Sequence, residues 1–273
     1  MSGLETKIIF YGISDVGRHR ENNEDRFIAA DLTRKVIGVY DNRVTPDLIC
    51  HKIGASGTVL VVADGLGGHE QGEVASQLAV EETVQYLFKV KNKESRPTEW
   101  LNDAIQNAHM NIRKASLYSN SPKSMGSTIT AIHIGREIIT VAQVGDSRAY
   151  SFRNGKLKLL TEDQTLVGML QKKGLLTDEQ AVSHPSKHVI LQALGQDKEI
   201  YAEISSHKFQ DKDYLLLCTD GLSSYVKHDT IEKILSSSSD TPTHCQHLID
   251  AANANGGLDN VTVVLARLEI TSR

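Results

Sequence analysis

Acidic residues stand at the ends of several apolar runs, and their placement points to chemistry. One apolar run leads directly into Asp64-Gly65, and a second leads through one threonine into Asp220. A third run begins directly after Asp259-Asn260. Any one of these acids is explained by a turn, because aspartate is a preferred turn residue. Their repetition calls for another explanation, since short apolar runs predict strands, and strands of one sheet end close together.

Carboxylates gathered at neighbouring strand ends repel one another unless a cation lies among them. Oxygen ligands with no convergent histidine or cysteine favour Mg²⁺ or Mn²⁺ over zinc. Gly65 has no side chain, so its carbonyl could approach such an ion as a further ligand. Two ions about 3.5–4 Å apart can share a hydroxide and polarise a phosphoryl oxygen. The pattern therefore predicts metal-assisted hydrolysis of a phosphate ester.

The elements that position these acids are predicted from the same apolar runs. Strands are expected at 58–63, 127–134, 138–144, 148–152, 214–218 and 261–268, where Val, Ile, Thr and Leu dominate. Helices are expected at 72–90, 100–118, 230–235 and 242–254, the last of them capped by Thr241. Asn154-Gly155 favours a two-residue hairpin turn. Blocks of strands separated by helices favour an α+β fold.

The composition narrows the class of protein. The chain has 273 residues, 40% of them hydrophobic, and no long linker divides it, so we expect one domain over 1–273. No run approaches the ~20 apolar residues that span a bilayer, and the first residues do not form a secretory signal. A net charge of -4 gives no reason to expect nucleic-acid binding. Three scattered cysteines fit a reducing cytoplasm. We expect a cytoplasmic monomer.

Eight stretches together resemble a known family. They are GRHRENNEDRF (17–27), VVADGLGGHEQGEVAS (61–76), GST (126–128), VGDSRAY (144–150), LTEDQTLV (160–167), HPSKHVILQALG (184–195), LLLCTDGLSSYV (215–226) and DNVTVV (259–264). In this order and over nearly the whole chain, they resemble the metal-dependent protein phosphatases of the protein phosphatase 2C family, in its short bacterial form. The resemblance implies an α+β fold, a four-layer α-β-β-α sandwich of two antiparallel sheets flanked by helices.

The resemblance also implies roles for the acids. Asp64 matches the carboxylate that bridges two core metal ions, and the carbonyl of Gly65 would bind the second ion. Asp220 and Asp259 would bind the first. The two ions would be Mn²⁺ or Mg²⁺, and their shared hydroxide would attack the phosphate ester of phosphoserine or phosphothreonine.

Four further residues are implied around these ions. Glu24 and Asp25 would hold metal-bound waters. Asp163 matches an acid that takes a third ion together with Asp220, although it could instead cap the helix that follows. Arg20 matches the arginine that clamps the substrate phosphate, although it could instead form a surface ion pair with a neighbouring glutamate.

The sequence departs from the family pattern at some positions. Leu66 stands where animal members have a histidine proposed as the general acid, so either His69 or a metal-bound water could protonate the leaving group. Gln164 stands where many members have histidine. We interpret Asp146 as structural, bonding the turn backbone and Arg148. Two longer segments have no assigned chemistry: 31–57 is expected to be a surface insertion, and 166–183 falls where the family has its flap beside the active site.

The predicted function is a serine/threonine protein phosphatase that opposes a serine/threonine kinase. Two alternatives stay open: an inactive phosphoprotein-binding module, and a phosphatase of a small molecule or of phosphohistidine. A cysteine-dependent phosphatase is excluded, because Cys50, Cys218 and Cys245 each lack an arginine six residues further on.

Overall fold

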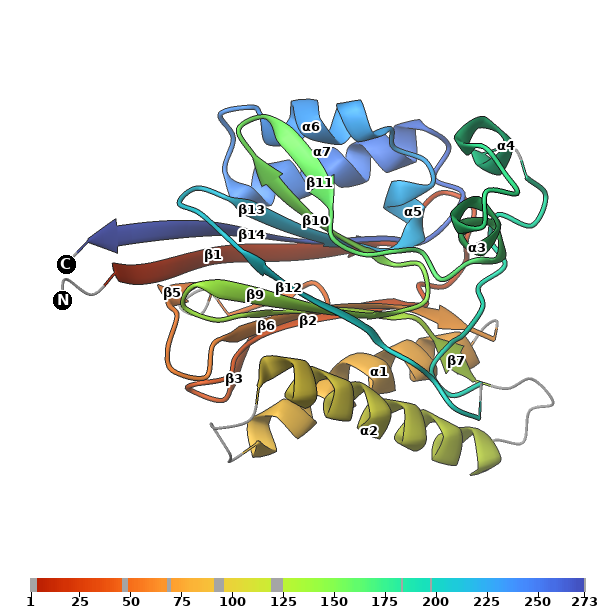
Figure 1. The fold of residues 1–273 in the computed structure, drawn as a ribbon, viewed down its shortest axis with the longest axis horizontal. Coiled ribbons are helices and arrows are strands. Elements are labelled where there is room, and N and C mark those ends of the chain that lie inside the picture. The colour runs from red at the N-terminus through yellow and green to blue at the C-terminus, as the bar shows by residue number, and fades with distance from the viewer. Residues whose placement is uncertain are drawn as a thin grey trace.

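The protein consists of two antiparallel sheets packed face to face, with helices on both outer sides (Figure 1). This computed structural model describes residues 4–45, 49–67, 70–90, 96–118, 125–182, 184–196 and 198–272. The layers follow the order helix, sheet, sheet, helix, so the expected four-layer α+β sandwich is confirmed.

The first sheet has the strand order β11-β10-β13-β14-β1-β5. Its strands are β1 (Leu4–Asp15), β5 (Cys50–Lys52), β10 (Arg148–Arg153), β11 (Lys156–Leu159), β13 (Tyr214–Cys218) and β14 (Val261–Ser272). The strands β1 and β14 pair along their whole length at the middle of this sheet. The predicted hairpin is confirmed as β10 and β11, and Asn154 and Gly155 take the positive φ angles, 50° and 77°, that this turn requires.

The second sheet has the order β12-β9-β8-β6-β2-β3-β4, with β7 paired to β6 at one end. Its strands are β2 (Asp25–Asp31), β3 (Val36–Tyr40), β4 (Arg43–Val44), β6 (Thr58–Leu66), β7 (Gly126–Ser127), β8 (Ile129–Ile134), β9 (Ile138–Val144) and β12 (Glu203–Lys208). The single strand expected at 127–134 is therefore two strands, separated at Thr128.

Helices cover the outer face of each sheet (Figure 1). Against the second sheet lie α1 (Glu70–Lys89) and α2 (Pro97–Tyr118), and against the first lie α6 (His228–Leu235) and α7 (Thr241–Ala254). Three short helices, α3 (Leu166–Lys172), α4 (Asp178–Val182) and α5 (Asp220–Ser223), complete the chain. In the part of the chain that the structure describes, no helix has the length and apolar character needed to cross a membrane.

Each central strand is apolar on both sides because each sheet is covered on both faces. In β6, Leu60 and Val62 pack between the sheets, whereas Val59 and Val61 pack under the helices. This double burial explains why the apolar runs predicted these strands so well, although they lack the alternation of a half-exposed strand.

The start of α7 corrects one expectation. Its N-cap is Asp240, whose side chain accepts a hydrogen bond from the backbone N–H of Thr243 at 2.9 Å, and Thr241 is already helical. Both residue types are good caps, but an aspartate there also favours the helix dipole.

The segment 31–57 is not a surface insertion, which corrects a second expectation. Its strands β3 and β4 extend the second sheet, and β5 pairs with β1 in the first sheet. Val39 and Ile53 are buried between the sheets. Inside the segment, His51 lies against the buried Thr58 hydroxyl at 2.8 Å. The polar composition of this segment suggested a surface insertion. Its short strands are polar because they lie near the edges of the sheets, where one side of a strand faces water.

Candidate active site

Asp64 lies near the end of β6, where the backbone is held by the turn between β7 and β8. Its N–H donates to the Thr128 hydroxyl at 2.9 Å, and its carbonyl accepts from the Thr128 N–H and from the Ser127 hydroxyl. These bonds explain the break at Thr128 that divides the expected strand. Across the sheet, Asp64 stands in register with Asp25 of β2.

Asp220 and Asp259 come from the first sheet. Asp220 begins α5 directly after β13, and Asp259 precedes β14. The two connections are joined by Thr219 and Thr262: the Thr219 N–H donates to the Thr262 carbonyl, and the Thr262 N–H donates to the Thr219 hydroxyl at 3.0 Å. The acids at the ends of these strands are thereby brought to the same end of the sandwich as Asp64.

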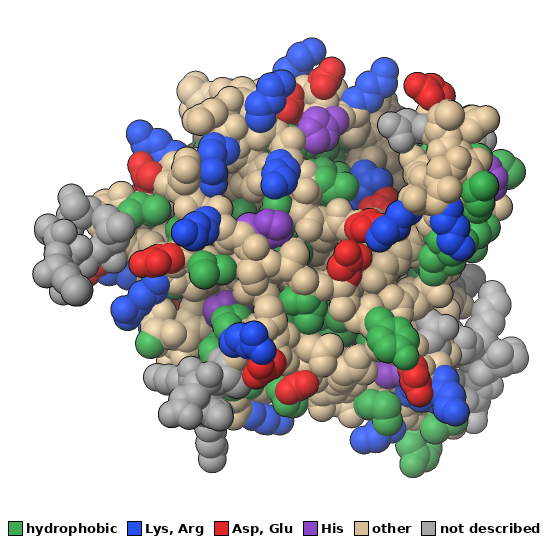
Figure 2. Space-filling model, in the orientation of Figure 1, with side chains coloured by type: hydrophobic (Ala, Val, Ile, Leu, Met, Phe, Trp, Pro, Cys, Tyr) green, Lys and Arg blue, Asp and Glu red, His purple; other side chains and the backbone are tan. Residues whose placement is uncertain are grey.

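One cavity of about 430 Å³ unites most of the predicted site. It is lined by Asp64, Gly65, Asp220, Asp259, Arg20 and Glu24, together with Asp146 and His188. Of the other predicted residues, Asp25 lies beneath the cavity and Asp163 lines a neighbouring one. In Figure 2, acidic and basic side chains lie together beside a hollow toward the right of the molecule, and further side chains of both kinds are scattered over the rest of that face.

Crowding of carboxylates raises the pKa of several of them. Burial lifts the pKa of Asp64 well above its ordinary value, and the negative charges of Asp25 and Asp220 add to the effect. Burial also raises the pKa of Asp25 to about 7, although its Oδ2 accepts hydrogen bonds from the hydroxyls of Thr219 and Thr262, each at 2.7 Å. Such a group of acids is stabilised either by protons or by a bound cation.

The Arg20 side chain bonds directly to Asp259, one of the predicted metal ligands. Its Nη2 donates to Asp259 Oδ2 at 2.8 Å, and its side chain is half exposed. The direct bond of Arg20 is thus to Asp259, and the negative charge of the neighbouring Glu24 also acts on its guanidinium. The other N–H groups of the guanidinium stay at the cavity, where they could donate hydrogen bonds to a phosphate.

Asn260 is a site residue that the sequence analysis did not single out. Its side-chain carbonyl accepts from the Glu24 N–H at 2.8 Å, and its amide donates to the carbonyls of Val16 and Asn22 at 2.9 Å. It thus fastens the loop that carries Arg20 to the start of β14. The signal was its place beside Asp259 in the DN pair.

The roles of Asp146 and Arg148 differ from the expectation. Arg148 donates to Asp163, not to Asp146: its Nε lies 2.8 Å from Oδ1, and its Nη2 lies 2.5 Å from Oδ2. Asp163 is also not a helix cap, because Thr165 caps α3 by accepting from the Gly168 N–H. These contacts occupy both oxygens of Asp163.

Asp146 lines the central cavity together with Asp64 and Asp220. Burial raises its pKa to about 7, and the charges of Asp220 and Asp163 add to the effect. Asp146 is therefore part of the acidic site. The sequence signal was its position one glycine after an apolar run, much as Asp64 directly follows another.

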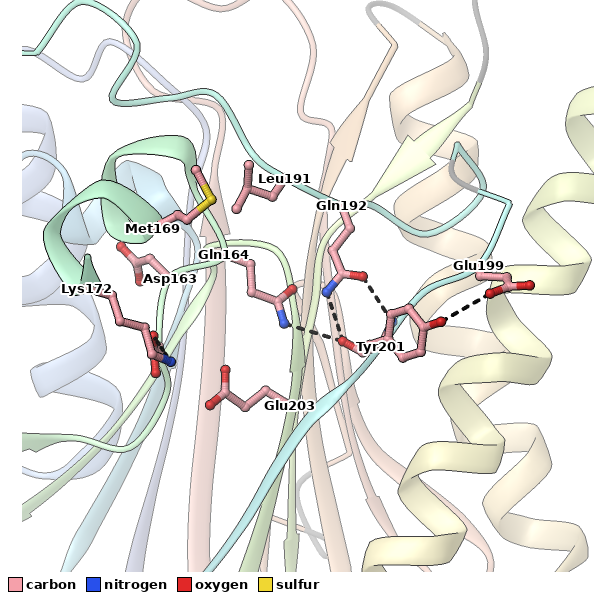
Figure 3. A pocket seen from close by; sticks show the side chains of 10 residues that line it. Asp163, Gln164, Met169, Lys172, Leu191, Gln192, Glu199, Tyr201 and Glu203 are labelled. Carbon is pink, nitrogen blue, oxygen red and sulfur yellow. Dashed lines mark hydrogen bonds and ion pairs between the residues drawn. The ribbon is translucent and has the colours of Figure 1, made fainter. Parts of the chain in front are cut away.

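Gln164 holds the turn that precedes Asp146. Its backbone N–H donates to the Gly145 carbonyl at 3.0 Å, and its side-chain oxygen accepts from the Gly145 N–H at 2.8 Å. Its amide donates to the Tyr201 carbonyl at 3.4 Å, which also accepts from Gln192 at 2.9 Å. Figure 3 shows these two glutamines pointing to the same carbonyl. Gln164 stands where many family members have histidine, and here it links the turn before Asp146 to the segment before β12.

Three residues were considered or are found near the part of the cavity where a leaving group could be protonated. Leu66 lines the cavity, in keeping with the departure from animal members, and His69 lies outside the described residues. His188, which lies in the stretch 184–195 and was given no role from the sequence, has its Nδ1 3.7 Å from Asp220 Oδ2. The segment expected to form the flap contains α3 and α4, which lie at the acidic end (Figure 1).

The donors at this site fit a hard divalent cation. They are carboxylate oxygens, and a Cβ added to Gly65 would lie 2.0 Å from the Gly72 carbonyl oxygen, so the backbone can pass there only as glycine. Within the described ranges, no three His, Cys, Asp or Glu side chains already converge as a metal cage. A bound metal ion is therefore indicated by the carboxylate donors of the cavity and by the crowding of their negative charges.

A two-sheet sandwich with an acidic end is the arrangement that the resemblance to the metal-dependent phosphatases predicted, and comparison with known proteins gives the family. The family model "Protein phosphatase 2C" matches residues 40–258. The chain is 34% identical to the serine/threonine phosphatase stp of Listeria monocytogenes over an alignment of 270 residues that covers 95% of this chain and 96% of that protein. The chain therefore belongs to the protein phosphatase 2C family.

Two solved structures agree with this assignment. The serine/threonine phosphatase PstP/Ppp of Mycobacterium tuberculosis has a TM-score of 0.80 at 31% identity, covering 96% of this chain and 99% of that one. The catalytic domain of PstP in complex with two manganese ions has a TM-score of 0.78 at 29% identity, covering 97% and 99%. The resemblance seen in eight short motifs is thus confirmed over the whole fold.

Proposed function

We infer that this chain is a metal-dependent serine/threonine protein phosphatase, and that its acidic cavity hydrolyses phosphoserine and phosphothreonine in proteins. The observation that carries this function is one cavity in which Asp64, Asp220 and Asp259 meet Arg20. The similarity to serine/threonine phosphatases over nearly the full length supports the substrate class. A binding module without activity is less well supported, because it has no use for so many crowded acids.

Asp64 and the Gly65 carbonyl, with Asp220 and Asp259, would hold two ions, and Asp25 and Glu24 would act through water. Bound Mn²⁺ or Mg²⁺ lowers the pKa of water and withdraws charge from the phosphoryl group. Asp64 is suited to the central position because its carboxylate is buried among the other acids, and burial and then their charges raise its pKa. Loading with a cation would therefore displace protons from this group.

Arg20 would hold the substrate phosphate. Its guanidinium presents several N–H donors in one plane, which match two phosphate oxygens. The bond to Asp259 orients it toward the cavity, and Glu24 and Asp64 also attract its charge. A phosphate held there would sit next to the acids, as an in-line attack by water requires.

A third ion would lie beside Asp220. Asp163 stays a predicted ligand, but its two oxygens already accept from Arg148. Asp146 shares the central cavity with Asp220 and has no such engagement with Arg148. We therefore favour Asp146 as the direct ligand, with Asp163 acting through Arg148.

The cellular setting is part of the proposal. Phosphorylated proteins would be the partners, as substrates of a serine/threonine kinase that this enzyme opposes. We further propose a monomer with one catalytic domain over 1–273 that acts in the cytoplasm, with no nucleic-acid or membrane partner. The choice of Mn²⁺ or Mg²⁺ follows the supply of each ion, since both suit oxygen donors.

The function is tested by phosphate release from a phosphothreonine peptide after the protein is stripped with a chelator. Activity is expected to return with Mn²⁺, and to exceed that on small phosphomonoesters such as sugar phosphates. No activity with any added divalent ion, in protein shown to be folded by circular dichroism, would favour the binding module. Preference for the small esters or for phosphohistidine would instead change the substrate class.

A further inference from the structure

The acidic cavity also has side chains that neither metal binding nor phosphate binding uses. Leu258 and Tyr225 line it together with Asp259 and Arg20. Divalent cations are held by oxygen ligands, and phosphates are held by groups such as guanidinium. The Leu258 side chain can do neither, and the Tyr225 ring presents mainly an apolar surface. Their place at the cavity therefore calls for another explanation.

Leu258 is more exposed than the apolar residues around it. Its exposed fraction is 46%, whereas Ala252 near the end of α7 and Val261 at the start of β14 are buried. Single exposed leucines are common on protein surfaces. Leu258 differs from these because it lies at a cavity and directly precedes Asp259, whose carboxylate accepts from Arg20 at 2.8 Å.

The loop between α7 and β14 is held in place from two sides. The Gly257 carbonyl accepts from the Arg18 N–H at 2.7 Å, which fastens this loop to the one that carries the predicted phosphate-binding arginine. The Asn255 side-chain amide donates to the Tyr225 carbonyl at 3.0 Å, which fastens it to the segment after α5. Leu258 is therefore positioned by the same connections that join the parts of the cavity.

A phosphate bound at Arg20 would bring the neighbouring residues of a substrate to these side chains. The guanidinium contacts Asp259, and Leu258 is the residue before it. Consecutive Cα atoms lie about 3.8 Å apart in the loop and in the substrate alike. A residue directly before or after the phosphorylated one would thus lie within reach of Leu258 and Tyr225.

We propose that Leu258 and Tyr225 select phosphoproteins that carry an apolar side chain next to the phosphorylated serine or threonine. The inference rests on the proposed function, since it describes how the same cavity would choose among its substrates. An apolar side chain would remove the exposed surface of Leu258 from water, which is favourable. A charged side chain would lose its hydration against two uncharged side chains, which is unfavourable.

The preference is measured with phosphothreonine peptides that differ at one position. The residue directly before and the residue directly after phosphothreonine are each changed in turn to Leu, Ser or Lys, and kcat/KM is measured with saturating Mn²⁺. At the position that meets Leu258, the Leu peptide is expected to exceed the Ser peptide about fivefold, as covering half of a leucine side chain would give. Equal values for Leu and Ser at both positions would overturn the proposal.

The origin of the preference is tested with Leu258→Ser. The ratio of the Leu peptide to the Ser peptide is expected to fall from about fivefold to about one, and a ratio taken within one variant cancels any general effect on the metal site. Leu159→Ser is the matched control, because Leu159 is 39% exposed on β11 and does not line the cavity, and it should keep the fivefold ratio. A fivefold ratio that survives in Leu258→Ser would contradict the proposal.

A charge exchange separates selection from a structural role. Leu258→Glu is expected to reverse the order at low salt, so that the Lys peptide exceeds the Leu peptide about threefold at the same position. Rates that fall for all peptides in an unchanged order would show that Leu258 does not meet the substrate. Release of phosphate without any preference overturns only this inference, whereas no release from any peptide by the wild-type chain overturns the proposed function as well.

Discussion

The two ends of the sandwich are built from the same strands and have opposite chemistry. At one end, Asp64 lies near the end of β6 and Asp146 follows β9, and burial together with the charges of neighbouring carboxylates raises their pKa values. At the other end, Arg136 and His133 lie where β8 and β9 connect. The strands between them are apolar and buried. The difference teaches that the sheet is a neutral scaffold, and that a few residues at or near the strand ends decide the chemistry of each end.

The largest expected effect comes from removing a predicted metal ligand at the acidic end. Asp220→Asn is expected to lower phosphate release about a thousandfold or more, because charge stabilisation by a metal contributes several kcal/mol. The measurement is turnover of a phosphothreonine peptide with saturating Mn²⁺. Asp229→Asn, an exposed acid on α6, is the control and should retain full activity. Near-normal turnover of Asp220→Asn would remove the acidic end from the reaction.

The next effect distinguishes Asp146 from Asp163. Asp146→Asn is expected to lower turnover about tenfold and to raise the Mn²⁺ concentration needed for half activity, because it removes a charge from the cavity. Asp163→Ala should slow turnover less than Asp146→Asn does, and two ions should stay bound in titration calorimetry. Its main effect is to remove the partner of Arg148 and not a direct metal ligand. A larger shift in Mn²⁺ requirement for Asp163→Ala than for Asp146→Asn would assign the third ion to Asp163.

A smaller effect is expected from the residue that holds the Gly145 turn. Gln164→Ala should lower kcat about threefold with little change in KM, since the loss of its hydrogen bond from the Gly145 N–H displaces Asp146 only slightly. Gln164→Glu keeps the acceptor for the Gly145 N–H and should restore most of the rate. Gln192→Ala removes the other donor to the Tyr201 carbonyl without touching Gly145, and it should be neutral. Equal losses for Gln164→Ala and Gln192→Ala would show that the shared carbonyl, not Gly145, matters.

The smallest effect is on stability and follows from the raised pKa values. In metal-free protein, Asp25 and Asp146 have a pKa of about 7 when folded and an ordinary value when unfolded. The folded state therefore binds more protons between these values, and stability is lost as pH rises through about 7. We expect melting temperature in chelator to fall about 5 °C between pH 5.5 and pH 8. Mn²⁺ should remove this fall, and a rise with pH in chelator would contradict the sign.

Much of the fold was predictable where burial is complete. The runs 138–144 and 214–218 match β9 and β13 at both ends, because they are apolar on both faces. By contrast β1 was missed, since polar residues such as Thr6 and Lys7 interrupt its apolar side chains, and the edge strand β12 was missed because it is largely exposed.

The sequence allowed us to predict which types of residue form the site, but not which of them bond to one another. The acids at strand ends do meet in one cavity, since strand ends of packed sheets converge. The bonds of Arg148 to Asp163 and of Gln164 to Gly145 join segments 15 and 19 residues apart through turns that no local pattern specifies. The sequence therefore indicated which chemistry to expect but not which acid Arg148 would neutralise.

The central pairing of β1 with β14 has a consequence for synthesis on the ribosome. Leu4–Asp15 must wait for a partner about 250 residues later, and contacts between such distant segments form slowly. Until then, the nascent chain exposes one edge of β1 and lacks Asp259, which lies just before β14. We therefore expect phosphatase activity to appear only once β14 has been synthesised, and a product truncated before Asp259 to be inactive for a folding reason as well as a chemical one.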